Sequence, residues 1–107
     1  MHVAILTFNL GTVTKEQFLA TCDELAPKLA ATPGLVSKVW LADPSANTYG
    51  GVYTFRDRAA FDAFARSDFA KGLASNPTVS GMVMRDYSVL EGPTRVTRGL
   101  PASAAVA

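Results

Sequence analysis

The 107-residue chain is poor in the residues that most often carry enzyme chemistry, with one cysteine, one histidine and one tryptophan. A single cysteine, Cys22, excludes a disulfide within the chain. One cysteine and one histidine cannot supply the usual zinc or iron ligands. A nucleophilic Cys–His or Ser–His pair would have to use His2, at the start of the chain. We therefore expect no metal site.

Charged residues are also scarce, at 18% of the chain, and the net charge is only +1, with no basic or acidic run. The chain thus lacks the footprint of a nucleic-acid partner and the polybasic patch of a membrane-binding surface. Apolar runs such as residues 3–6 are too short to span a bilayer, and no signal peptide is visible. We expect a cytoplasmic protein without nucleic-acid or membrane partners.

Phosphate-binding glycine motifs are missing as well. No G-x-G-x-x-G follows a predicted strand, and no Walker loop is present. This absence disfavours enzymes of dinucleotides and nucleoside triphosphates. Together with the shortage of metal ligands, it leads us to expect a protein that uses no cofactor.

Apolar residues, by contrast, make up 49% of the chain, which is high for a single small domain with a modest core. Residues 33–40 and 49–55 read as a hairpin whose strands are apolar or aromatic on both faces. The chain's own helices can cover one face of such a sheet. The other face needs a partner subunit or a ligand.

The hydrophobic pattern predicts strands at residues 2–9, 35–42, 49–55 and 78–90. Thr14 and Gln17 form a capping-box pattern, which starts a helix that ends near Thr32, with a kink or an early end at Pro27. Asp57 caps a second helix, which breaks at Ser67 and resumes at residues 69–74.

This order is β-α-β-β-α-β, the ferredoxin-like arrangement of an α+β protein. It predicts a four-stranded antiparallel sheet with both helices on one face. We assign residues 1–91 to this domain and residues 92–107 to an extended or disordered C-terminal arm.

Side chains alternate between the two faces of a strand, so each strand can be divided into two sets. On residues 35–42, the set without a large polar or charged side chain is assigned to the helix-covered face. With the other strands, that face receives Ala4, Leu6, Phe8, Leu35, Ser37, Val39, Leu41, Val52, Thr54, Met82 and Met84. The remaining positions are assigned to the open face: Val3, Ile5, Asn9, Lys38, Trp40, Tyr53, Phe55, Val83, Arg85 and Tyr87. Apolar walls with a few polar groups suit a small-molecule pocket, and they suit a dimer interface equally well.

Several motifs resemble those of one superfamily: Phe8-Asn9, Pro33-Gly34 before Lys38-Val39-Trp40, the run from Gly50 to Phe55, and the run from Ser67 to Lys71. The chain resembles the dimeric α+β barrel superfamily, and in particular the small putative monooxygenases grouped with antibiotic-biosynthesis monooxygenases. The resemblance implies a homodimer in which two sheets face each other and close a barrel. It also implies a pocket in each subunit, between helices and sheet or at the sheet–sheet junction.

The resemblance implies several possible reactions, because the superfamily includes cofactor-independent oxygenases of aromatic polyketides, heme-degrading monooxygenases, cyclases and lactone isomerases. The heme-degrading branch uses a strand-one Asn, a Trp and a histidine on the second helix. Asn9 occupies the position of that Asn, but residues 57–74 contain no histidine. Heme degradation is therefore disfavoured.

Cofactor-free oxygenation needs an electron-rich aromatic substrate, a site that holds its ring, and groups that stabilise an oxyanion. Our candidates for catalysis are Asn9, Lys38 and Tyr53, as amide donor, charge and proton relay. Our candidates for substrate binding are Trp40, Phe55, Arg85 and Tyr87. Simpler roles are open for several of them: Trp40 as a core or dimer anchor, Lys38 and Arg85 at a solvated rim, and Asn9 in a turn.

Three functional hypotheses follow. The first is a homodimeric monooxygenase that combines a small aromatic molecule with dioxygen. The second is a cyclase or isomerase on the same scaffold, which would turn over without consuming oxygen. The third is a non-catalytic ligand-binding dimer.

Overall fold

The chain forms strands and helices in the predicted β-α-β-β-α-β order, in a computed structural model that describes residues 1–100. The elements are β1 (His2–Leu10), α1 (Lys15–Ala30), β2 (Leu35–Asp43), the 3₁₀ turn η1 (Pro44–Ala46), β3 (Thr48–Phe55), α2 (Arg58–Ala65), α3 (Asp68–Ala74), β4 (Val79–Ser88) and α4 (Glu91–Val96). The strands form one antiparallel sheet in the order β2-β3-β1-β4. The predicted fold class is confirmed.

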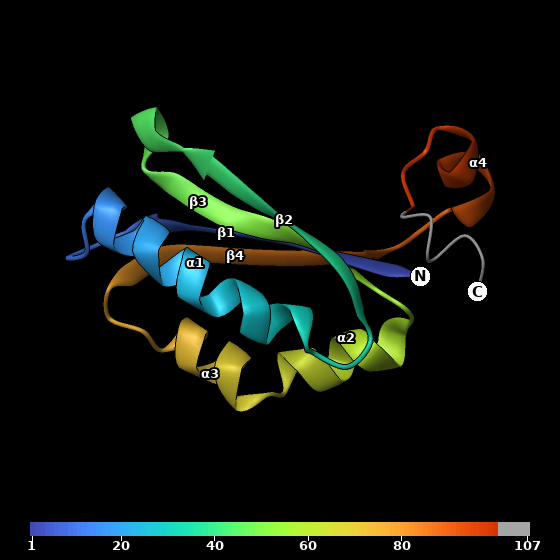
Figure 1. The fold of residues 1–107 in the computed structure, drawn as a ribbon, viewed down its shortest axis with the longest axis horizontal. Coiled ribbons are helices and arrows are strands. Elements are labelled where there is room, and N and C mark those ends of the chain that lie inside the picture. Colours follow the sequence, from blue (N-terminus) through green and yellow to red (C-terminus); the bar gives the residue numbers. More distant parts are fainter. Residues whose placement is uncertain (101–107) are drawn as a thin grey trace.

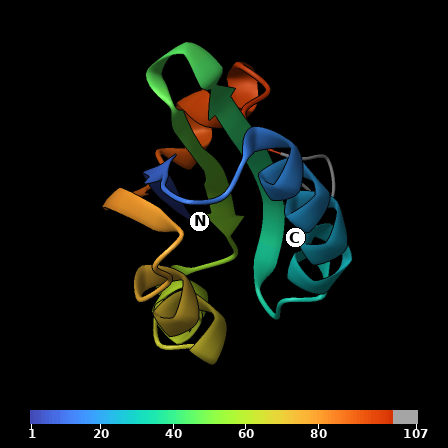
Figure 2. The same ribbon diagram turned by 90° about the vertical axis from the view of Figure 1, so that its left-hand side faces the viewer.

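The helices α1, α2 and α3 all lie on one face of the sheet (Figure 1). The helices α2 and α3 lie in line with each other (Figure 1), and in the view turned by 90° they overlap, while α1 lies apart from them beside β2 (Figure 2). The short helix α4 lies apart from this layer, beyond the end of β4 (Figure 1). Within residues 1–100, no helix is long and apolar enough to cross a membrane.

The helices begin where their capping residues predict. The Thr14 hydroxyl accepts a hydrogen bond from the Gln17 amide at 3.1 Å, and the Gln17 side chain accepts one from the Thr14 amide at 2.9 Å. The Asp57 carboxylate accepts from the Ala60 amide at 2.8 Å at the start of α2. Pro27 lies within α1, which continues to Ala30, so the early end considered at this residue does not occur.

Two asparagines tie the end of β1 to the turn between β2 and β3. Asn47 adopts a left-handed conformation, with φ of 49°, and its side chain donates to the Leu10 carbonyl at 2.8 Å. Asn9 Nδ2 donates to the Asn47 carbonyl at 2.9 Å. The Asn9 amide therefore has a structural role at this corner of the sheet, as a turn residue does.

The core lies between the sheet and the helices, and its β1 residues are those predicted. Ala4, Leu6 and Phe8 are buried, together with Phe61 and Phe64 from α2. Residues directly opposite in neighbouring antiparallel strands point to the same face. The assignments on β4 are also correct, because Met84 lies opposite Leu6, while Arg85 and Tyr87 lie opposite Ile5 and Val3 on the open face.

The prediction placed the side chains of β2 and β3 on the wrong faces of the sheet. In both strands, the helix-covered and open faces must be exchanged. Tyr53 lies opposite the buried Ala4 in β1 and opposite Lys38 in β2, so all three point toward the helices. Lys38, Trp40, Tyr53 and Phe55 thus belong to the helix-covered face, whereas Ser37, Val39, Leu41, Val52 and Thr54 belong to the open face. Leu35 alone keeps its predicted side, because the register shifts between Leu35 and Ser37.

The chain after β4 differs from the extended arm expected from residue 92. It forms α4, whose Glu91 carboxylate lies 2.6 Å from the N-terminal ammonium of Met1 and 3.0 Å from Arg95. The expectation of disorder for residues 101–107 lies outside the described residues, and the division of the chain at residue 91 stays a prediction.

Candidate functional site

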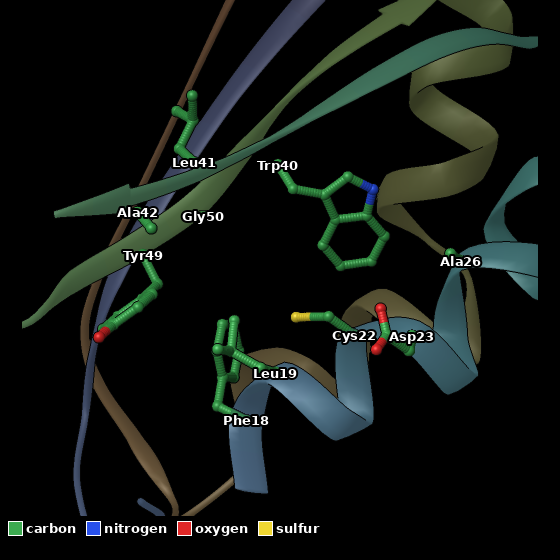
Figure 3. Close-up of a pocket in the computed structure, with 10 residues that line it drawn as sticks. All are labelled: Phe18, Leu19, Cys22, Asp23, Ala26, Trp40, Leu41, Ala42, Tyr49 and Gly50. Carbon is green, nitrogen blue, oxygen red and sulfur yellow. The ribbon is translucent and has the colours of Figure 1, made fainter. Parts of the chain in front are cut away.

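A cavity of about 430 Å³ lies between α1 and the β2–β3 hairpin (Figure 3). Phe18, Leu19 and Cys22 project into it from α1, and Trp40 faces them from β2. The full lining consists of Phe18, Leu19, Cys22, Asp23, Ala26, Trp40, Leu41, Ala42, Tyr49 and Gly50. Most of these side chains are apolar, and one carboxylate, Asp23, is among them, so the cavity suits a flat organic molecule.

Two smaller hollows lie beside this cavity. A chamber of about 40 Å³ lies deeper, and its walls include Cys22, Lys38 and Tyr53. A second hollow of about 200 Å³ lies toward the start of β2, and Lys38 also lines it. Trp40 lines all three spaces. This tryptophan, which is 37% exposed, is therefore the shared wall of the whole site.

Lys38 lies flat on the sheet because the neighbouring strand has no side chain at Gly51. A Cβ placed on Gly51 would come within 2.6 Å of Lys38 Cε and 3.3 Å of Tyr53 Cε1. In the space that glycine leaves, the Lys38 ammonium reaches 3.3 Å from the centre of the Trp40 ring and 4.5 Å from that of Tyr53. The amine is thus held between two aromatic faces by cation–π contacts.

The environment shifts the ionisation of this cluster. Burial lowers the pKa of Lys38 to about 8, with the charge of a Cys22 thiolate opposing the change. Burial raises the pKa of Tyr53 to about 12, so the phenol stays neutral at physiological pH. Burial also raises the pKa of Cys22, against the opposing effect of Lys38. Lys38 is therefore the group of this cluster that can take up and release a proton near neutral pH.

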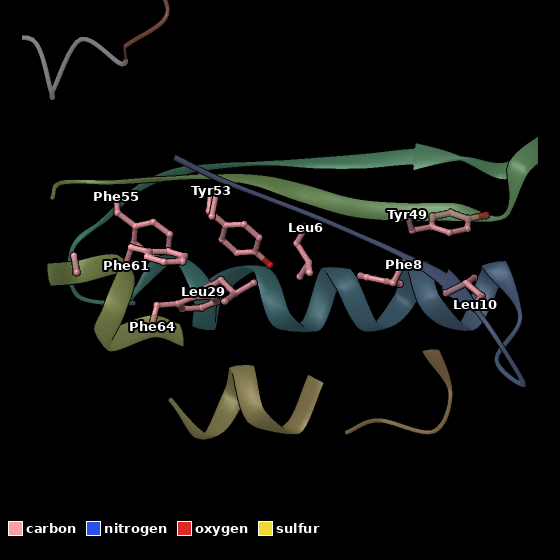
Figure 4. Packing of buried hydrophobic residues seen from close by; sticks show 11 residues of the cluster. Leu6, Phe8, Leu10, Leu29, Tyr49, Tyr53, Phe55, Phe61 and Phe64 are labelled. Carbon is pink, nitrogen blue, oxygen red and sulfur yellow. The ribbon is translucent and has the colours of Figure 1, made fainter. Parts of the chain in front are cut away.

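Three of the predicted site residues come together here, namely Lys38, Trp40 and Tyr53. Figure 4 shows Tyr53 pointing from the sheet toward the helices, with Phe55 beside it. Phe55 is 0% exposed and packs 5.4 Å from Phe64, ring centre to ring centre, so it belongs to the core and cannot contact a substrate.

The other predicted site residues lie elsewhere. Arg85 and Tyr87 are on the opposite face of the sheet, because they pair with the outward-facing residues of β1. The Asn9 amide is engaged in the turn at Asn47. Asn9, Arg85 and Tyr87 therefore do not share a pocket with Lys38 within one chain.

The sequence reasoning also missed the α1 wall of the site. Phe18 and Cys22 share the helical spacing of Leu25 and Leu29, a pattern that predicts core positions and gives no sign of a cavity. Tyr49 is buried, and its ring centre lies 5.1 Å from that of Phe18. A usable signal is Gly51, which lies opposite Trp40 on the helix-covered face and leaves space there because it has no side chain.

Solved structures show that this architecture is shared. An antibiotic biosynthesis monooxygenase from Deinococcus radiodurans, described as putative, superimposes with a TM-score of 0.70 at 11% identity, covering 86% of this chain and 95% of that one. SnoaB, a cofactor-independent oxygenase from Streptomyces nogalater, gives 0.63 at 18%, covering 84% and 94%. The heme-degrader MhuD from Mycobacterium tuberculosis, with two hemes bound in its active site, gives 0.66 at 18%, covering 84% and 96%. The chain thus has the fold of the antibiotic-biosynthesis-monooxygenase class.

The family can be stated more narrowly. Residues 4–100 match the family described as "Putative mono-oxygenase ydhR", and the chain belongs to that family. No functionally curated protein is similar enough in sequence to be matched to it. The resemblance deduced from the Lys-Val-Trp and Gly-Gly-x-Tyr-x-Phe motifs is therefore confirmed.

The residues of this chain do not fit heme as a resident group. The single histidine, His2, is 3% exposed, and its Nε2 lies 2.6 Å from Asp86 Oδ2. Its ring packs 5.1 Å from that of Phe61, away from the lining of the α1–β2 cavity. No imidazole is therefore placed to bind iron in the cavity.

Proposed function

We propose that the protein is a cofactor-independent monooxygenase, that it oxidises a small aromatic substrate in the cavity between α1 and β2, and that Lys38 is the group that ionises the substrate. One observation carries the proposal: a lysine amine with a pKa near 8 lies against Trp40 in a largely apolar pocket. Membership of a monooxygenase family supports it.

The first step of the reaction is loss of a proton from an anthrone, naphthol or hydroquinone. At neutral pH a fraction of Lys38 is unprotonated and can accept this proton. The resulting ammonium then lies beside the substrate anion and stabilises its charge. Trp40 provides a ring surface against which the flat substrate stacks.

The second step needs no further group from the protein. The substrate anion gives one electron to dioxygen, and the two radicals combine to form a carbon–oxygen bond. Loss of water from the resulting hydroperoxide leaves a carbonyl on the substrate. One oxygen atom enters the product, the other leaves as water, and the substrate supplies both hydrogens. Tyr53, which stays a neutral phenol, is placed near Lys38 to donate a hydrogen bond to the oxygen that carries charge.

The test is oxygen uptake by the purified protein with a panel of anthrones, naphthols and hydroquinones. We expect one oxygen molecule to be consumed for each anthrone converted to its quinone. Conversion of a confirmed substrate at the same rate without oxygen would contradict the proposal, and it would favour a cyclase or isomerase on this scaffold.

We further propose that the protein is a homodimer whose subunits meet through the open faces of their sheets. This face exposes large apolar side chains, with Val39 57% exposed, Val83 48% and Tyr87 50%. Exposed apolar surfaces of this kind often form interfaces between subunits. Native mass spectrometry tests the assembly, and a monomer at micromolar concentration would contradict it.

A further inference from the structure

Lys38 differs from the other three lysines of the chain in its surroundings. Lys15, Lys28 and Lys71 are exposed on helices, whereas Lys38 lies inside the layer between α1 and the sheet. Within residues 1–100 it forms no ion pair, and aromatic faces are its closest described contacts. This environment suits a lysine that reacts as an amine.

We propose that Lys38 captures flat aromatic aldehydes or ketones as a Schiff base, with the aromatic ring of the carbonyl compound bound against Trp40. This covalent activity goes beyond oxygenation and does not depend on it. The large cavity and the inner chamber share Cys22 and Trp40 in their walls, and Lys38 lines the chamber, so a ring in the cavity lies next to the space that holds the Lys38 amine.

The reaction is a condensation that needs no oxidant or reductant. The unprotonated Nζ attacks the carbonyl carbon, and a carbon–nitrogen bond forms. The carbonyl oxygen takes up protons, including one released by Nζ, and it leaves as water while the C=N bond forms. Burial favours both stages, because it keeps a fraction of the amine unprotonated near neutral pH and limits the water that would hydrolyse the imine.

A substitution at Gly51 tests the position of the Lys38 amine without replacing the lysine. A methyl group at this position would lie 2.6 Å from Lys38 Cε, so Gly51→Ala must move the Lys38 side chain off the sheet. The variant still contains both Lys38 and Trp40. Gly72 on α3 has no atom within 4 Å of the position of an added Cβ. Gly72→Ala is therefore a matched control.

The experiment uses the full chain at pH 7, without oxygen, with 2-naphthaldehyde as the probe and sodium cyanoborohydride to trap the imine. Peptide mapping then gives the labelling rate of each lysine separately. We expect Lys38 to be labelled at least about tenfold faster than Lys15, Lys28 or Lys71, because a larger fraction of its amine is unprotonated. Pentanal, which has no ring to stack on Trp40, should label Lys38 at least about threefold more slowly than 2-naphthaldehyde.

Gly51→Ala should lower the labelling of Lys38 at least about threefold, and Gly72→Ala should leave it unchanged, with circular dichroism confirming that both variants fold. Equal labelling of all four lysines would overturn the proposal, and equal rates with pentanal would overturn the aromatic preference. The labelling assay excludes oxygen, so a lack of Lys38 labelling would not contradict the oxygenase proposal. Conversely, a lack of oxygen uptake would not contradict the formation of a Schiff base at Lys38.

Discussion

The helix-covered face of the sheet has two halves that are packed differently. Under α2, Phe55 lies 5.7 Å from Phe61 and 5.4 Å from Phe64, and no exposed surface remains on it. Under α1, the same face carries Lys38 and Trp40 and leaves a cavity of about 430 Å³.

The difference shows how a small domain can contain both a core and a site. A closed aromatic cluster holds β3 in place at one end, and the rigid strand then positions the residues of the open end. We therefore expect substitutions in the two halves to affect different properties, the α2 half stability and the α1 half activity.

The largest effect is expected from Lys38→Met, in the half of the helix-covered face under α1. Removal of the only group in the cluster that titrates near neutral pH should lower the rate of oxygen uptake by about 10²–10⁴-fold. Lys15→Met, which removes an exposed lysine on α1, should leave the rate within about twofold of the original. If both variants retain full activity, the chemistry does not involve Lys38.

Substitutions in the half under α2 should lower the stability of the protein. Phe55→Ala removes a fully buried ring and should lower the free energy of unfolding by about 3–5 kcal/mol, measured by urea denaturation with far-ultraviolet circular dichroism. Trp40→Ala removes a ring that is already 37% exposed beside a cavity, so its cost should be clearly smaller. Equal losses for the two variants would contradict the division of the face into packed and open halves.

The open face of the sheet gives a third contrast. Tyr87→Lys adds a charge beside Arg85 at the proposed subunit interface and should raise the dimer dissociation constant at least about tenfold, or about 1.4 kcal/mol. Ala63→Lys adds the same charge on the exposed surface of α2 and should leave dimerisation unchanged. Analytical ultracentrifugation measures both constants, and equal constants would place the interface elsewhere.

The smallest effect concerns pH. The pKa of Lys38 is lowered from 10.5 to about 8 in the folded chain, so between these values the unfolded chain binds more protons. Stability should therefore rise with pH from about 8 to 10.5 relative to Lys38→Met, and this contribution should be lost as the pH falls through 8. Parallel stability curves for the two proteins would show that the amine is not desolvated.

The sequence was sufficient to predict the order of the elements, their caps and the family, because those depend on local patterns. Thr14 with Gln17, Asp57 and Ser67 all cap helices as expected. The faces of β1 were also predictable, because Leu6 and Phe8 alternate with the polar Thr7 and Asn9 at the end of this strand.

The faces of β2 and β3 could not be assigned in this way, because both strands are apolar on both sides. We treated the charge of Lys38 as a sign of solvent, but Gly51 leaves a hollow in which its stem lies under the helix. The same error placed Lys38, Trp40 and Tyr53 together but on the wrong face. Only the pairing of β3 with β1 settles the side on which they lie.

The position of Trp40 has a practical consequence. It is the single tryptophan of the chain, it lies against an ammonium group, and it lines three neighbouring hollows. The tryptophan fluorescence of the unlabelled protein therefore comes from one indole in the wall of the site. A change in its emission on adding a compound reports occupancy directly, so collections of aromatic molecules can be screened optically before any reaction is known.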